Sequence, residues 1–155
     1  FLGQEHELEI VDGAPWPAEI VGGKLVVTIQ KRLSDLERQA KVKQRLHELY
    51  QQAALEEFQT RTEYYGRRLF VRASDIRVKS YKRRWGSCSN NGELSYNWRL
   101  VIAPAAVLDY VAAHEVSHLV EHNHSLEFWR IVEELMPSYR EQKVWLKLNG
   151  GTLAI

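Results

Sequence analysis

The chain has 155 residues, of which 45% are hydrophobic and 26% charged, and its formal net charge is +1. This length predicts a single domain with a true hydrophobic core, which needs no metal or disulfide merely to stay folded. The composition excludes long disordered regions, and the small net charge excludes a global attraction to nucleic acid or anionic membranes, so that only local basic patches could supply one.

Three features bear on where the protein works. The single cysteine, Cys88, cannot form an intramolecular disulfide, and the longest uncharged apolar run, LVIAPAAVL, is too short to span a bilayer. We therefore expect a soluble, cytoplasmic protein with no membrane partner. Because the chain starts at Phe1 and its only methionine is Met136, we also expect it to be a fragment of a longer chain.

The first two predicted segments are a hairpin and a long helix. Within residues 1–33, the strand-like stretches HELEIV and KLVVTI flank a turn-rich segment, which predicts a β-hairpin. Ser34 and Glu37 have the spacing of a capping box, in which each side chain bonds a free backbone N–H of the other residue. This box opens an amphipathic helix over residues 34–66, which Gly66 is expected to end.

Residues 75–155 are predicted to hold the rest of the domain. The stretches DIRVKSYKRRWGSC and ELSYNWRLVI partly alternate and flank Asn91 and Gly92, which predicts two antiparallel strands. Pro104 suits the first turn of a helix. The run that follows, AAVLDYVAAHEVSHLVEH, is apolar on nearly every side, so this helix should lie buried at the centre of the domain.

Two further helices complete the expected fold. Ser125 can cap LEFWRIVEELM, while Ser138 and Glu141 have the spacing of a second capping box for YREQKVWLKLN. Strands come early and helices late, which is typical of an α+β protein. We expect a small antiparallel sheet packed against helices, with the histidine-rich helix at the centre.

His114, Glu115 and His118 form an HExxH pattern in that central helix. Residues four apart project from one helical face, so both imidazoles can reach one ion at ~2.0–2.1 Å. Glu115 is angled to hold a water on that ion and to act as catalytic acid/base. A polar helix face is the alternative, but an apolar helix favours coordination because an unpaired buried charge is costly.

The spacing HExxHxxxxxH supplies a third ligand, His124. Asn123 tolerates the left-handed backbone that would end the helix and turn the chain back, whereas His122 lies about 12 Å along the helix axis from His114 and is expected at the rim. Three neutral imidazoles and an open fourth position are typical of catalytic zinc, although other divalent transition metals suit such a site. Competing third ligands lie on the next helix: Glu127 and Glu134.

Four stretches, RRWGSC, NWRLVIAP, LDYVAAHEVSHLVEHNHSLEFW and VWLKLNGG, together resemble the YgjP-like family of zinc metallopeptidases. That family is similar to the SprT-like and WLM proteins, and the resemblance runs from about Ile76 to Gly151. It implies a zincin-like fold in which the same three histidines bind the metal and the same glutamate is the catalytic acid/base. Metzincins place a glycine where this chain has Glu121, which sets the chain apart from that peptidase clan.

The expected function is a zinc-dependent, metallopeptidase-like hydrolase in which the metal and Glu115 activate a water. The resemblance implies a second substrate class, because a member of the family has been assigned a UTP pyrophosphatase activity. A third hypothesis is a zinc-supported nucleic-acid-binding module without chemistry, which predicts salt-dependent binding. The expected partner is therefore a peptide or a nucleoside triphosphate, and nucleic acid is less favoured.

The basic stretch KSYKRRWGSC decides between these substrates. A strand at the sheet edge could align an extended peptide through its free backbone groups, while arginine forks match phosphate oxygens. A solvated edge that prevents aggregation is the alternative. We take Lys82, Arg83 and Arg84 as candidate substrate-binding residues and expect Trp85 in the core.

Further candidates precede the HExxH pattern in the sequence. Tyr96, Arg99 and Tyr110 could stabilise negative oxygen charge in the transition state, and Tyr96 and Arg99 are also candidate substrate-binding residues. Cys88 could be a nucleophile or a ligand, but a small buried side chain is the favoured interpretation.

Overall fold

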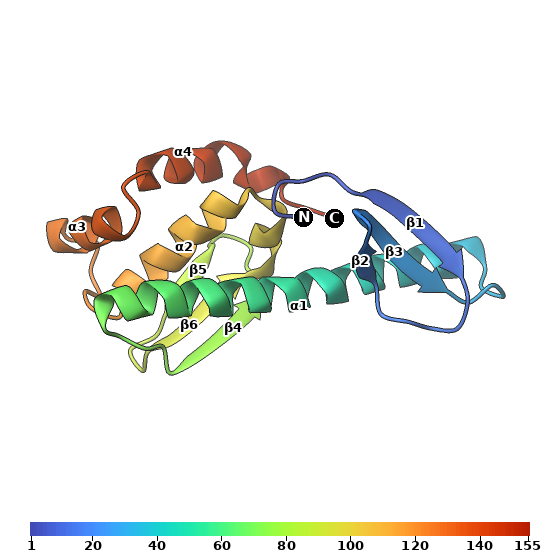
Figure 1. The fold of residues 1–155 in the computed structure, drawn as a ribbon, viewed down its shortest axis with the longest axis horizontal. Coiled ribbons are helices and arrows are strands. Elements are labelled where there is room, and N and C mark those ends of the chain that lie inside the picture. The colour runs from blue at the N-terminus through green and yellow to red at the C-terminus, as the bar shows by residue number, and fades with distance from the viewer.

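A single long helix, α1 (Asp35–Leu69), runs through the molecule in a computed structural model that describes residues 1–155 (Figure 1). The predicted capping box at its start is present: the Ser34 N–H donates to the Glu37 carboxylate at 2.8 Å, and the Glu37 N–H donates to Ser34 Oγ at 3.4 Å. Gly66 does not end the helix, which continues to a left-handed cap at Phe70. A Cβ on Gly66 would lie 2.7 Å from the carbonyl oxygen of Val71, so this glycine lets the departing chain fold back closely.

The N-terminal lobe is a three-stranded sheet on the first half of α1 (Figure 1). Its strands are β1 (Glu7–Asp12), β2 (Glu19–Val21) and β3 (Lys24–Ile29), in the order β1-β3-β2. The predicted hairpin of β1 with β3 is wrong, because those two strands are parallel. The turn-rich segment contains β2, which forms the hairpin with β3 instead.

The second lobe comprises the second half of α1 and residues 70–155, and it contains the second sheet. We call it the metal lobe because it includes the three candidate metal-binding histidines. Its strands are β4 (Asp75–Lys79), β5 (Gly86–Cys88) and β6 (Glu93–Asn97), in the order β4-β6-β5. The prediction of two antiparallel strands is corrected: β4 is parallel to β6, and only β5 is antiparallel to it. The apolar residues after β6 form a 3-10 helix, η1 (Trp98–Ile102), rather than more strand. Both sheets are therefore mixed.

Helix α2 (Ala105–Ser117) lies at the centre of the metal lobe, as its apolar sequence predicts. Around it lie α1, the second sheet, α3 (Leu126–Leu135), α4 (Tyr139–Asn149) and the short η2 (Gly150–Thr152) (Figure 1). Ser125 Oγ accepts the expected cap bond from the Phe128 N–H at 3.3 Å. The second capping box does not form, because Ser138 lacks the extended backbone of an N-cap and its side chain makes no cap bond. No helix is both long and apolar enough to cross a membrane.

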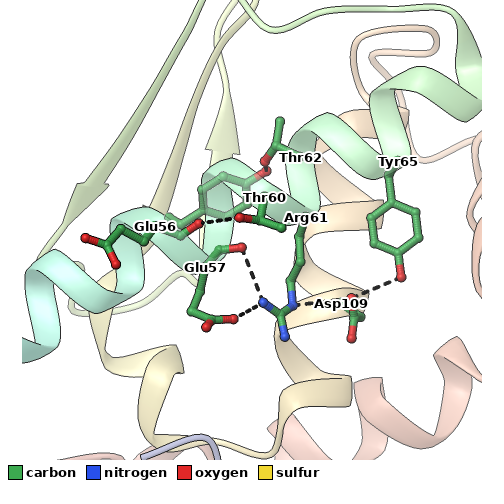
Figure 2. Close-up of polar contacts among 8 residues, drawn as sticks. Glu56, Glu57, Thr60, Arg61, Thr62, Tyr65 and Asp109 are labelled. Carbon is green, nitrogen blue, oxygen red and sulfur yellow. Dashed lines mark hydrogen bonds and ion pairs between the residues drawn. The ribbon is translucent and has the colours of Figure 1, made fainter. Parts of the chain in front are cut away.

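A polar cluster fixes α2 against α1 (Figure 2). The Arg61 guanidinium of α1 pairs with Glu57 on its own helix, and its Nε lies 3.3 Å from Asp109 Oδ1 of α2. The Tyr65 hydroxyl donates to the same Asp109 oxygen at 3.2 Å. Burial raises the pKa of Asp109, while the Arg61 charge opposes that rise. Two residues of α1 thus hold one carboxylate near the start of the helix that carries His114.

Candidate metal centre

Three histidine side chains converge at the C-terminal end of α2. His114 lies in the last turn of the helix, His118 is its C-cap residue, and His124 lies in the segment before α3. The Nε2 atom of His124 is 3.1 Å from Nε2 of His118 and 3.2 Å from Nε2 of His114. One ring nitrogen carries at most one hydrogen, so hydrogen bonding alone gives no good account of both contacts. A shared cation accounts for them.

The path of the chain to His124 differs from the prediction. Helix α2 ends at Ser117, more than a turn before Asn123, and the φ angle of Asn123 is not positive. The turn forms at residues 118–120 instead, where the Glu121 N–H donates to the Ser117 carbonyl at 2.9 Å. His122 is exposed at the rim of the site. The competing carboxylates are exposed and absent from the cluster: Glu127 and Glu134.

Hydrogen bonds to the outer ring nitrogens set the tautomers. His118 Nδ1 lies 3.1 Å from the Glu121 carbonyl oxygen, which can only accept, so Nδ1 carries the proton and the Nε2 lone pair is free for a metal. His114 Nδ1 lies 3.5 Å from the Tyr110 hydroxyl. Tyr110, a candidate for transition-state stabilisation, therefore lies behind a ligand, with its hydroxyl against the histidine ring.

The donor set fits a zinc ion. Two ligand nitrogens of a tetrahedral site with Zn–N lengths of ~2.0–2.1 Å lie ~3.3 Å apart, close to the two measured contacts. Burial lowers the pKa of His114 to about 3, with further lowering from His118, His124 and Lys143, and burial also lowers the pKa of His118. Both rings are therefore neutral at physiological pH, as ligation requires.

Glu115 is buried beside the histidines, with only 5% of its surface exposed. Burial raises the pKa of its carboxyl to about 8, although the charge of Arg84 opposes that rise. Its side chain lies against Gly86 of β5, where a Cβ would come within 2.7 Å of Glu115 Oε1. Sequence reasoning missed Gly86, whose only signal was its place in the stretch RRWGSC.

A surface hollow of about 370 Å³ opens over these groups. Of the three basic candidates for substrate binding, only Arg84 lines it; Lys82 and Arg83 are exposed in the same loop but outside the lining. The three lie between β4 and β5 rather than on a strand, which corrects the prediction. Nine residues line the hollow: Arg84, Gly86, Ser87, Cys88, His114, Glu115, His118, His122 and His124.

Two other predicted substrate residues do not reach the hollow. Tyr96 has no exposed surface; its ring stacks on Phe58 at 4.0 Å, and its hydroxyl lies 2.8 Å from that of Thr62. The ring of Tyr96 fills part of the core and its hydroxyl contacts that of Thr62, so this hydroxyl is not available to a substrate. The guanidinium of Arg99 lies 4.8 Å over the ring of Trp98 on η1 and is not among the lining residues.

The surroundings of Cys88 and Trp85, near the site, favour a structural role for both residues. Cys88 lines the hollow, but burial raises the pKa of its thiol to about 11, so it stays protonated and is a poor nucleophile at neutral pH. Trp85 is half-buried and packs against the main core. A Cβ on Gly150 would clash with the Trp85 ring, so this glycine permits the close approach of η2 to the loop before β5.

Phe128 of α3 forms the floor of the histidine cluster and was not identified from the sequence. It is fully buried, and its ring centroid lies 4.3 Å from His118, 4.9 Å from His114 and 5.0 Å from His124. The Ser125 cap fixes the start of α3 and hence the position of this ring. The apolar floor keeps water from the inner side of the site, while the hollow leaves the outer side open.

The sequence matches a known protein family. The model of the family described as YgjP-like, metallopeptidase domain, matches residues 1–149, which extends the resemblance noted from Ile76 onward to the start of the chain. No curated protein matches the sequence.

Two solved structures of metallopeptidase zymogens share the fold of this chain. The chain is similar to the metallopeptidase zymogen abylysin of Pyrococcus abyssi, with a TM-score of 0.52 and 20% identity, over 61% of this chain and 93% of that one. Jannalysin of Methanocaldococcus jannaschii, also a metallopeptidase zymogen, gives a TM-score of 0.52 and 19% identity, over 59% and 94%. Wss1 of Saccharomyces cerevisiae gives 0.48 and 12%, over 97% and 99%. The chain has an α+β fold shared with metallopeptidases, and three of its histidines are positioned to bind zinc. Because the family model also matches nearly all of its length, the chain belongs to the YgjP-like metallopeptidase domain family.

Proposed function

We propose that the protein hydrolyses polypeptides with zinc held by His114, His118 and His124 and with Glu115 as general base. The observation that carries this proposal is the convergence of three imidazoles beside a buried carboxylate, under an open hollow. A structural zinc site would be closed by a fourth protein ligand. The open side is therefore where a substrate would meet the catalytic groups.

Zinc held by His114, His118 and His124 would keep its full charge, which would polarise a substrate carbonyl and lower the pKa of a bound water to about 7. Glu115 would take the proton of the attacking water and later pass it to the leaving amine. A general base works best when its pKa is near the working pH, and burial moves the Glu115 pKa in that direction.

The edge strand β5 supports a polypeptide as substrate. It is the outer strand of the second sheet, and Gly86 and Cys88 at its two ends both line the hollow. An extended peptide would pair with the free backbone groups of such an edge. The absence of a side chain at Gly86 lets the Glu115 side chain lie directly against this edge.

Arg84 is the one observation that favours a second candidate, the hydrolysis of a nucleoside triphosphate. Its guanidinium forms no ion pair with a protein carboxylate, and the residue lines the same hollow as the histidines. A guanidinium there could bind phosphate oxygens. It could equally bind a backbone carbonyl or an acidic side chain of a peptide, so we retain the nucleotide as the alternative substrate.

One assay separates these candidates. Zinc-loaded protein is offered an unfolded polypeptide, UTP and other nucleoside triphosphates side by side, with Glu115→Gln as the matched variant. We expect cleavage of the polypeptide by the wild-type protein. Glu115→Gln should keep its zinc and lose roughly 10²- to 10⁴-fold in kcat, the usual contribution of a general base.

Each other outcome overturns a named part of the proposal. Turnover at the wild-type rate by Glu115→Gln would show that Glu115 is not the general base. Release of pyrophosphate from UTP without peptide cleavage would show that the substrate is a nucleoside triphosphate and not a polypeptide. Salt-dependent binding of nucleic acid without any hydrolysis would support the non-catalytic module instead.

A further inference from the structure

A column of aromatic rings connects one metal-binding histidine to another. His124 stacks on Trp129 of α3, with ring centroids 5.9 Å apart and an interplanar angle of 23°. Trp129 stacks on Tyr139 of α4 at 5.4 Å and 20°, and Tyr139 stacks on Tyr110 of α2 at 6.4 Å and 20°. The Tyr110 hydroxyl then lies 3.5 Å from Nδ1 of His114. Three helices thus contribute to one continuous path around the site.

His124 depends on this column more than the other two histidines do. His114 and His118 belong to α2 or its C-cap, and the Nδ1 atom of each ring lies near a protein oxygen. His124 is exposed in a segment without regular structure, and its only polar ring contacts are those of Nε2 with the other two histidines. No polar group outside the histidine cluster therefore orients this ring.

We propose that Trp129 is a positioning residue that holds the His124 ring in its metal-binding orientation by stacking on it. Phe128 also touches His124, but edge-on at 86°, and the histidine on which Phe128 stacks is His118, at an interplanar angle of 21°. The stacking face for His124 is supplied by Trp129. Trp129 is itself fixed by Tyr139 and by the Lys143 ammonium, whose nitrogen lies 4.2 Å from the ring centroid.

The column also explains why the C-terminal helices matter to the site. Neither α3 nor α4 contributes a metal ligand, yet α3 supplies Trp129 and α4 supplies Tyr139 and Lys143. A pre-oriented ligand loses less conformational freedom when the metal binds, so the affinity for zinc rises. The inference requires only that the histidines bind a metal, and it holds whether the substrate is a peptide or a nucleotide.

The test is zinc affinity, measured by competition with a chromogenic chelator on the full chain. Trp129→Leu removes the ring and Trp129→Phe keeps a smaller one, so we expect affinity to fall in the order Trp, Phe, Leu. The loss for Trp129→Leu should be roughly threefold to tenfold, the range of one aromatic stack. Trp145→Leu is the matched control, because Trp145 on α4 is also half-buried against the core and contacts no histidine ring.

A double-mutant cycle ties the effect to His124. In a His124→Ala background, Trp129→Leu should change the affinity less than about twofold, the cycle's usual precision. The visible spectrum of the Co²⁺ form should shift for Trp129→Leu toward that of His124→Ala and stay unchanged for Trp145→Leu. Equal losses from Trp129→Leu and Trp145→Leu, or an undiminished loss without His124, would overturn the proposal. Unchanged affinity in both Trp129 variants would overturn it as well.

Discussion

The two lobes of the molecule differ in what they bury. The metal lobe contains a continuous core of 20 buried hydrophobic residues and all six buried polar or charged residues, Glu115 and His118 among them. The N-terminal lobe has a core of four buried residues, and every residue of β1 is exposed. Its ion pairs, such as those of Lys24 with Glu7 and Glu9, lie at the surface. Burying titratable groups costs free energy, and only the lobe with the large core does so.

The strongest test of this contrast is the pH dependence of stability in the metal-free protein. The folded state raises the pKa of Glu115 from about 4.5 in the unfolded chain to about 8. Between these values the unfolded chain releases the proton and the folded chain keeps it, so the stability falls as the pH rises and levels off above pH 8. Glu115→Gln removes this dependence. We expect the variant to be more stable by up to about 5 kcal/mol at pH 8.5, at about 1.36 kcal/mol per pH unit.

Urea unfolding of both proteins from pH 4.5 to 8.5 measures the effect. His114 has the opposite dependence, because its lowered pKa makes the stability rise with pH between about 3 and 6.5. That contribution is present in both proteins and cancels in their difference. A difference that stays constant over this pH range would show that Glu115 is not forced into its protonated form by burial.

A smaller contrast is expected from matched truncations in the two lobes. Leu108 on α2 has no exposed surface, whereas the Ile10 side chain on β1 is 47% exposed. We expect Leu108→Ala to lower the free energy of unfolding by about 2–5 kcal/mol, because it leaves a cavity. Ile10→Ala should cost less than about 1 kcal/mol, because its side chain is half in water already. Similar losses in urea unfolding would mean that the lobes are equally packed.

Local patterns in the sequence explain which parts of the site could be predicted. The spacing of His114 and His118 depends only on helical periodicity, and the Ser34–Glu37 box depends on residues three apart. Both interactions lie within one turn of chain, and the structure places their atoms together. The α+β class also follows from the order of strands and helices along the chain.

Long-range packing explains what the sequence missed. The parallel pairing of β1 with β3 depends on β2 occupying the other edge, and no local pattern indicates this. Tyr96 has the chemistry of a substrate ligand, but its burial depends on contacts with Phe58 and Thr62 of α1. The ring column likewise joins residues from three helices. Non-local contacts of this kind require the assembled fold.

We propose that His124, brought back by the turn after α2, completes a three-histidine zinc site. Zinc titration with elemental analysis of the wild-type protein, His124→Ala and His122→Ala tests it most directly, because His122 is an exposed neighbour outside the cluster. We predict one zinc per wild-type chain and an unchanged zinc affinity for His122→Ala. His124→Ala should lose roughly 100-fold or more in zinc affinity, because removing a ligand should cost at least as much as the largest losses seen when a partner of a ligand is removed. Zinc affinity that survives in His124→Ala, or a wild-type chain that takes up no metal at saturating zinc, would contradict the claim.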